Sequence, residues 1–542
     1  MKIQLTQKIR ETSKKVAAAI RKYGKQTIRK VAEQVGCSKS AAHRHIQSQK
    51  KRNLYPESWF WETEEGQSWL RLLVLGSLYI LGLQRNVGAE HLSSFFKLLR
   101  IDTHVGVSPS ALRTQLQKME NLLPEFKDMC EEGQAGKGAR AVLSGDETFF
   151  RDLMVLVLMD LPSGYLLLEE SAGDRRFSTW LNKAKPRLEE LGIEVKHAVT
   201  DRAKALIKLA LQGFGCNSGA DLFHVLRDLS KSLGLALYRA LDRAETKVHE
   251  SIAKLQALEE SSASKTEIGA QAQCVDNDDL NHNMLKKSHD DYRETLQEIS
   301  DTIHPFTIEN SKAQTSAEVE RSLAEKAQKL EEIVWLHDLE DRQEGVDKFH
   351  NQLKDLSSGV DVWWVWAVES LTTYTLEKDK VNWLLYVLLP VCYWHRQIER
   401  TQNPMSCKKY KKAWEDSLAV LQAHRLTMML TSEELNHWQG WAQWMANLFH
   451  RSSSAVEGRN GWLAQMYHNG RGLTVKRLQA LTVIHNFGIK RADGTTAAER
   501  FFKTQFPDLF QWLVEQMGEL PLPRKNRVGS IANPLNLQVV PS

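Results

Sequence analysis

The chain has 542 residues, of which 42% are hydrophobic and 26% are charged, and its formal net charge is +5. This length is enough for about three domains, and the balance is typical of a soluble globular protein, which excludes a wholly disordered chain. The positive charge is concentrated at one end, because residues 1–55 contain 15 Lys and Arg against 2 Asp and Glu. Such a segment is typical of a nucleic-acid-binding module, and the alternative is a basic disordered tail.

Membrane and disulfide classes are also excluded. The longest uncharged apolar runs, 72–83 and 383–394, are shorter than the roughly 18–20 residues that cross a bilayer, so we expect buried core helices there. The N-terminus has no signal-peptide pattern. The six cysteines lie far apart without a C-x-x-C pair, which argues against a zinc cluster or a disulfide framework. We therefore expect a cytoplasmic protein with no membrane partner.

The first predicted elements form a helix-turn-helix at 27–52. Apolar spacing predicts a short first helix, Gly36 fits a left-handed turn, and Ser38 can cap the second helix. The second helix of this motif lies in the major groove, so its polar side chains face bases or phosphates. The predicted DNA-binding residues are Lys39, Ser40, His43, Arg44, Lys50, Lys51 and Arg52. A two-helix corner that binds no DNA is the alternative.

Residues 92–119 repeat the layout with less positive charge. An apolar helix is followed by Gly106, then by Ser108 and Pro109 as cap and first-turn residue of a second helix with Arg113 and Lys118. The pattern fits either a second DNA-binding unit or a module for packing or dimerisation.

From about residue 141 the pattern of apolar residues becomes typical of strands. Residues 141–150, 152–160 and 165–171 read as an antiparallel meander. A helix at 178–191, a strand at 195–201, a further helix, and a short strand at 220–226 running into a helix follow. The order β-β-β-α-β-α-β-α predicts a ribonuclease-H-like mixed five-stranded sheet.

Two aspartates and one glutamate stand out in this frame. Asp146 falls inside the first strand and Asp201 at the end of the fourth, and these two strands are neighbours in such a sheet. Glu457 falls at the start of a helix that Ser453 or Ser454 can cap. Carboxylate oxygens are preferred by Mg²⁺, and two ions about 3.5–4 Å apart can drive phosphodiester chemistry. We predict that the three acids bind two Mg²⁺ ions, with Mn²⁺ as a possible substitute; solvated surface carboxylates are the alternative.

At these residues the chain resembles the DDE transposases of bacterial insertion sequences. The matching segments are "LSGDETFF", "AVTDRAKAL", "ADLFHVLRDLSK" and "SSSAVEGRNGWL". The resemblance implies Asp146, Asp201 and Glu457 as catalytic residues, and metal-dependent cleavage of transposon ends followed by strand transfer into target DNA. It also implies double-stranded DNA as partner and a homodimer or higher oligomer, since two ends are handled together. A domesticated or inactive helix-turn-helix regulator and a ribonuclease-H-like structure-specific nuclease are the alternatives.

Four further residues come from the same segments. Asp221 and His224 match a "D-x-F-H-V" pattern and are candidates for supporting the metal ligands or touching DNA; a packed strand end is the alternative. Arg459 and Asn460 are predicted at the rim of the site, where they could contact phosphate. The alternative is that they are ordinary helix residues.

Asp201 and Glu457 are separated by far more residues than a compact sheet needs, which predicts an α-helical insertion at 232–446. Thr315 and Glu318 form a capping-box pattern. Residues 260–283 are polar and are predicted to be a flexible loop. The tryptophans of 362–366 and Trp383 are predicted in a helical core, with base stacking as the alternative.

The predicted organisation has six parts: a basic DNA-binding domain at 1–55, a helical domain at 56–135, the first part of the catalytic domain at 136–231, the insertion at 232–446, the closing helices at 447–500, and a C-terminal helix with an extended tail at 501–542. The tail has a small basic cluster at Arg524, Lys525 and Arg527. The protein as a whole is expected to be mostly helical.

Overall fold

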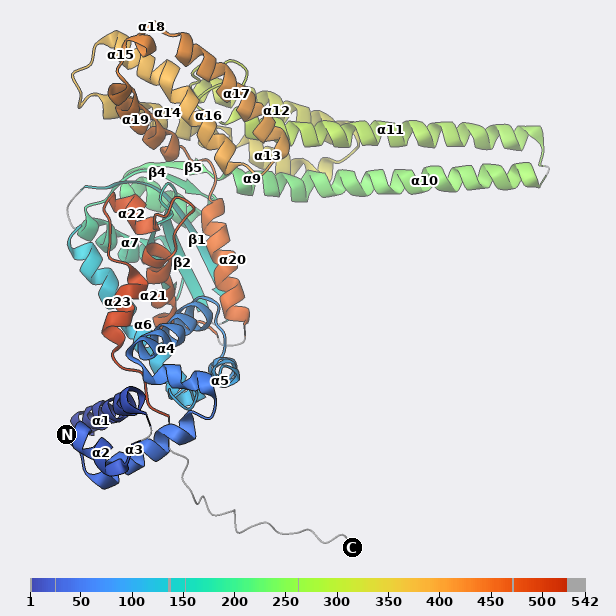
Figure 1. The fold of residues 1–542 in the computed structure, drawn as a ribbon. Coiled ribbons are helices and arrows are strands. Elements are labelled where there is room, and N and C mark those ends of the chain that lie inside the picture. The colour runs from blue at the N-terminus through green and yellow to red at the C-terminus, as the bar shows by residue number, and fades with distance from the viewer. Residues whose placement is uncertain are drawn as a thin grey trace. The chain divides into compact units, whose positions relative to one another are not determined.

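The computed structural model describes residues 2–24, 26–134, 138–151, 153–261, 263–469 and 472–523 (Figure 1). The chain is mostly helical and divides into two compact units. Unit 1 comprises Met1–Gly133, Gln465–Glu499 and Thr504–Ser542, and unit 2 comprises Gln134–Ala464 and Arg500–Lys503. The basic cluster predicted at Arg524, Lys525 and Arg527 lies outside the described residues.

A five-stranded sheet forms the centre of unit 2 (Figure 1). Its strands are β1 (Arg140–Phe150), β2 (Leu153–Asp160), β3 (Leu166–Ala172), β4 (Glu194–Thr200) and β5 (Asn217–Ala220). The order is β3-β2-β1-β4-β5, with antiparallel β1–β2 and β2–β3 pairs and parallel β1–β4 and β4–β5 pairs. This is the predicted ribonuclease-H-like sheet. Parallel β4 and β5 need crossover helices, which the chain supplies.

The helices that follow the strands are α7 (Phe177–Leu191), α8 (Lys204–Lys208), η3 (Leu209–Phe214), α9 (Leu222–Leu229) and η4 (Ser230–Gly234). As predicted, α7 ends at Gly192, whose φ of 64° lies in the left-handed region that glycine adopts without strain. Gly145 of β1 lies against Trp180 and Leu206, so α7 and α8 cover one face of the sheet.

The predicted strand at 220–226 is wrong. β5 ends at Ala220, and Asp221 is the N-cap of α9, accepting a hydrogen bond from the Phe223 N–H at 2.9 Å. Leu222, Val225 and Leu229 are the buried residues of α9, and their spacing is helical. A short apolar run does not by itself distinguish these two structures.

The regular elements of the insertion after η4 are helices throughout its described residues, and one isolated bridge pairs Phe306 with Ala313. Its elements are α10 (Leu235–Glu260), α11 (Lys265–Thr302), α12 (Ser316–Leu336), η5 (Glu340–Arg342), α13 (Gln343–His350), α14 (Leu353–Leu371), α15 (Lys378–Trp383), η6 (Leu384–Leu388), α16 (Leu389–Arg400), α17 (Pro404–Ala423), α18 (Arg425–Met429) and α19 (Ser432–Leu448). The capping box of Thr315 and Glu318 is present. Trp363, Trp366 and Trp383 are buried, which confirms their prediction as core residues, while Trp364 is half-buried and its Nε1 donates to the Gln314 carbonyl at 2.9 Å.

The flexible loop predicted at 260–283 is wrong. α11 begins at Lys265 behind a capping box of Ser264 and Glu267, and it forms a long hairpin with α10, in green in Figure 1. Ile268 and Val275, seven residues apart, are only half-buried. A two-helix hairpin needs only such a narrow apolar stripe, and its other faces are polar, which is why the composition resembled a loop.

Unit 1 begins with α1 (Lys2–Tyr23), α2 (Ile28–Val35) and α3 (Lys39–Arg52). The predicted helix-turn-helix is present: Gly36 has φ 69°, and the Ser38 hydroxyl accepts a hydrogen bond from the Ala41 N–H at 3.1 Å. α1 was not predicted. It completes the small core of Val16, Ala19 and Val31, against which residues of all three helices pack.

The rest of unit 1 is also helical. It contains η1 (Pro56–Glu62), α4 (Glu64–Ser77), η2 (Leu78–Gln84), α5 (Ala89–Leu98), α6 (Pro109–Glu132), α21 (Val475–Val483), η7 (Ile484–Gly488) and α23 (Leu509–Met517), while α22 (Ala497–Phe502) is shared between the two units. α4 and η2 together, Glu64–Gln84, are long and apolar enough to cross a membrane by length and composition alone. Gly82 lies against Leu92 and Leu116, so this helix packs within unit 1.

α6 has the predicted cap, since the Ser108 hydroxyl accepts a hydrogen bond from the Ala111 N–H at 3.3 Å. Its polar side chains have protein partners: Arg113 pairs with Glu90, and Lys118 donates to the Met517 carbonyl at 2.6 Å. Its apolar face packs against α21, α23 and η2. These contacts favour the packing module over a second DNA-binding unit.

Candidate active site

The two predicted aspartates lie at the same end of neighbouring parallel strands. Ser144 of β1 pairs with Val199 of β4, so Asp146 and Asp201 each stand two residues further along. Asp146 is half-buried and accepts a hydrogen bond from the Glu147 N–H at 2.9 Å. Asp201 follows the last residue of β4 and accepts one from the Ala203 N–H at 2.8 Å. The sheet alone therefore brings these carboxylates to one edge.

α20 (Ser454–His468) supplies the third acid. Glu457 lies in its first turn, and Asn460, three residues on, shares the same face. The Asn460 side-chain amide donates to Asp146 Oδ2 at 2.7 Å, which holds α20 against β1. Glu457 is half-exposed, and its Oε1 lies 3.1 Å from His224 Nε2.

The pKa of Asp146 is affected by both of the other acids. Burial and then the charge of Glu457, with a smaller contribution from Asp201, raise the pKa of Asp146 to about 7, although the Glu147 N–H opposes this. A buried carboxyl group that faces other carboxylates, and whose pKa is raised for both reasons, lies in a site that favours a cation.

A chain of hydrogen bonds connects Glu457 to α9. His224 Nδ1 lies 2.7 Å from Asp221 Oδ2, and its Nε2 contacts Glu457, so the ring bridges two carboxylates. The hydrogen bond to Asp221 raises the pKa of His224, against the effect of burial. Burial raises the pKa of Asp221, but hydrogen bonds from His224 and Ser453 outweigh it and the net shift is downward.

Ser453 has a role that sequence reasoning missed. Its hydroxyl donates to Asp221, and its carbonyl accepts the N–H groups of Val456, at 2.7 Å, and Glu457. Serine at a helix start predicted a cap, but no pattern indicated a partner more than 200 residues upstream.

The placement of Arg459 at the rim near phosphate is wrong. Its guanidinium is buried and donates two hydrogen bonds of 2.6 Å to Glu169 of β3. It also lies 4.5 Å from the centre of the Trp462 ring. Arg459 therefore fastens α20 to the sheet. Glu169 was the available signal, because an acid within an apolar strand requires a partner.

The residue types fit a divalent metal, whereas the side chains as they stand do not enclose one. In the part of the chain that the structure describes, no group of three or more His, Cys, Asp or Glu side chains is arranged to hold a metal ion. Glu457 contacts His224, and Asp146 accepts from Asn460. The Asn460 Oδ1 is buried and has no hydrogen-bond partner among the described residues, so it is available as an oxygen ligand beside Asp146.

The predicted DNA-binding residues lie on α3, and Lys39, Ser40, His43, Arg44, Lys50 and Lys51 are exposed. The prediction that Arg52 binds DNA is wrong, because its Nη2 donates to the buried Glu62 Oε2 at 2.5 Å. The Asn53 side chain donates to Glu62 Oε1 at 2.9 Å. Arg52 therefore joins the helix-turn-helix to η1 and is committed to that contact.

Comparison with known proteins identifies one segment. Residues 384–529 match the model of a family described as a family of unknown function, DUF6399. The match covers about a quarter of the chain, from η6 through α20 into the C-terminal helices, and includes Glu457 but neither Asp146 nor Asp201. No curated protein matches the chain.

Proposed function

We propose that the protein is a DDE transposase that cleaves transposon-end DNA and joins it to target DNA. The observation that carries the proposal is the hydrogen bond from Asn460 to Asp146, which brings the start of α20 to the sheet edge although Glu457 lies 256 residues beyond Asp201. The third acid comes back to the first two after a large insertion. This supports a shared chemical role for the three acids.

In this proposal Asp146, Asp201 and Glu457 hold two Mg²⁺ or Mn²⁺ ions, which when bound activate the attacking oxygen and stabilise the leaving oxygen of a phosphodiester. Asn460 orients Asp146 through its hydrogen bond, and His224 orients Glu457. The exposed residues of α3 bind the transposon end, because its basic side chains suit phosphates. A homodimer or higher oligomer in the cytoplasm remains our prediction.

The test uses the full chain, Mg²⁺ and a labelled duplex with the inverted repeats that flank the coding region, with Asp146→Ala as control. We expect metal-dependent nicking at the repeat end and joined products, both lost in the control. Binding without cleavage would instead identify a DNA-binding regulator. Cleavage without joining would identify a structure-specific nuclease.

A further inference from the structure

The residue after Asp201 has a strained backbone. Arg202 has φ 70°, in the left-handed region that residues other than glycine rarely adopt. Such a conformation is strained and persists only where surrounding contacts hold it. The contacts of Arg202 therefore decide where the turn carrying Asp201 lies.

Those contacts come from two elements. Arg202 Nη1 donates to the carbonyl and hydroxyl oxygens of Ser218 in β5, both at 3.3 Å. Its Nη2 lies 2.6 Å from Asp355 Oδ2, in the first turn of α14. Both side chains are partly buried, with 21% and 28% exposed, so solvent weakens this ion pair less than an exposed one.

α14 belongs to the insertion and packs closely on the sheet at this point. The His197 ring of β4 lies against Gly219 of β5 and Gly359 of α14, and a side chain at Gly219 would collide with it. The insertion is thus in direct contact with the strand that leads into Asp201.

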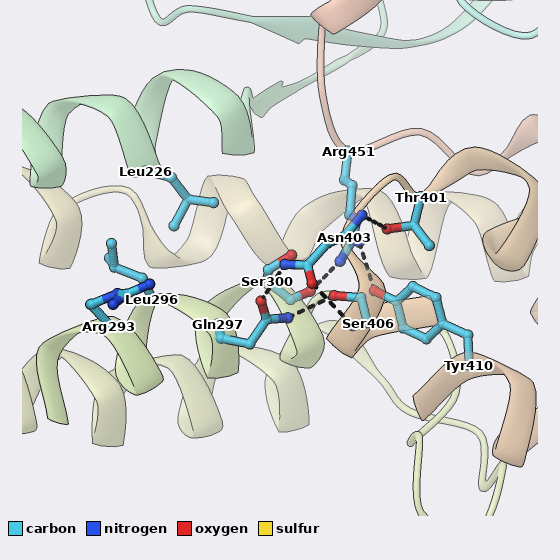
Figure 2. A pocket seen from close by; sticks show the side chains of 10 residues that line it. All are labelled: Leu226, Arg293, Leu296, Gln297, Ser300, Thr401, Asn403, Ser406, Tyr410 and Arg451. Atoms are coloured by element: carbon cyan, nitrogen blue, oxygen red, sulfur yellow. Dashed lines mark hydrogen bonds between the residues drawn. The ribbon is translucent and has the colours of Figure 1, made fainter. Parts of the chain in front are cut away.

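A second connection runs to the segment before Glu457. Arg451 donates to the carbonyl of Ser300 and, at 3.2 Å, to that of Ile303, at the end of α11, and at 3.2 Å to the Tyr410 hydroxyl of α17. Figure 2 shows Arg451 and Tyr410 beside a cavity of about 280 Å³ between these helices. The Arg451 carbonyl also accepts the Leu222 N–H of α9 at 3.0 Å.

We propose that Arg202 and Asp355 are a positioning pair through which the helical insertion sets the place of Asp201 in the metal site. The inference rests on the proposed function for its chemical meaning. Its geometric content, that α14 holds the 200–206 turn, is independent of that function.

The experiment compares Asp355→Asn with Glu369→Gln in the full chain. Glu369 is the matched control, since it also lies on α14 and contacts Lys196 of β4 at 3.6 Å, but it has no contact with Arg202. We expect Asp355→Asn to weaken Mn²⁺ binding about tenfold or more, as for partners of metal ligands. We also expect faster hydrogen exchange in 200–206, a lower kcat for cleavage and an unchanged KM for DNA, with Glu369→Gln near wild type.

If the single variant unfolds, a double variant with the charges exchanged, Arg202→Asp with Asp355→Arg, provides the test. It restores the attraction between the two side chains and should recover part of the Mn²⁺ affinity. Equal exchange and equal Mn²⁺ affinity in Asp355→Asn and Glu369→Gln overturn the inference. If the wild-type protein neither binds Mn²⁺ nor cleaves DNA, the proposed function fails, and hydrogen exchange at 200–206 still decides whether α14 holds the turn.

Discussion

Asn460 donates a hydrogen bond of 2.7 Å to Asp146, joining two side chains that are 314 residues apart in the sequence. Its Oδ1 remains without a partner in the described structure. This one amide connects α20, which carries Glu457, to the strand that carries the first acid.

Replacement of Asn460 by alanine tests that connection. Asp146 Oδ2 then loses its donor, so we expect a loss of about 1–2 kcal/mol in the free energy of unfolding and a lower kcat for cleavage. Calorimetry and cleavage kinetics measure both. Gln465→Ala, an exposed residue later in the same helix, is the control. Equal behaviour of the two variants would contradict the connection.

The Asp146→Asn variant should be more stable than wild type without metal at pH 8. The pKa of Asp146 in the folded protein is about 7, above the ordinary 3.8. The stability that this carboxyl group contributes is therefore fully present below pH 3.8 and is lost as the pH rises through 7. Removing the charge should gain about 2–4 kcal/mol at pH 8 and almost nothing at pH 4. Mn²⁺ should raise the melting temperature of the wild type only. A rise in the variant as well would place the metal elsewhere.

His224 is predicted to orient Glu457. His224→Ala should lower kcat for cleavage by about tenfold, the scale found for residues that support metal ligands, while His224→Gln keeps a donor and should retain more activity. The exposed neighbour Phe223 serves as control through Phe223→Leu. Loss of activity in Gln and Ala variants alike, with weaker DNA binding, would assign His224 to DNA contact instead.

The ion pair of Arg459 and Glu169 is predicted to be structural. Arg459→Met removes the guanidinium that pairs with the buried Glu169 carboxylate and should cost about 3–5 kcal/mol of stability, whereas Arg459→Met with Glu169→Leu should recover most of that loss. Thermal unfolding of both variants checks this. If the single variant is stable but binds DNA weakly, Arg459 contacts phosphate.

Acid should weaken the attachment of the helix-turn-helix. Burial raises the pKa of Glu62, but hydrogen bonding and charge from Arg52 outweigh burial and lower it below 4.5. Its contribution is therefore present above pH 4.5 and is lost as pH falls through the folded-state pKa. Glu62→Gln should be less stable than wild type at pH 7, with a difference that shrinks toward pH 3. A constant difference over this range would show that charge plays no part.

The strands, the first helix-turn-helix and the three candidate acids were predictable because local signals specify them. Short, nearly continuous apolar runs indicate buried strands, Gly36 and Ser38 mark the turn and cap, and an acid inside an apolar strand demands a partner. Residues 260–283 were mistaken for a loop because a two-helix hairpin buries few side chains. The strand at 220–226 was mistaken because the apolar residues of so short a run do not show whether it is a strand or the start of a helix.

The sequence by itself determined the ribonuclease-H-like sheet and the helix-turn-helix, since these depend on neighbours within a few residues, and it singled out Asp146, Asp201 and Glu457 as candidates. Only the tertiary structure decided what each polar side chain contacts. Arg459 and Arg52 look like DNA contacts in sequence, yet each is paired with a buried glutamate, because a charge removed from water must find an opposite charge nearby. That partner is chosen by the packing of distant segments, which local patterns do not encode.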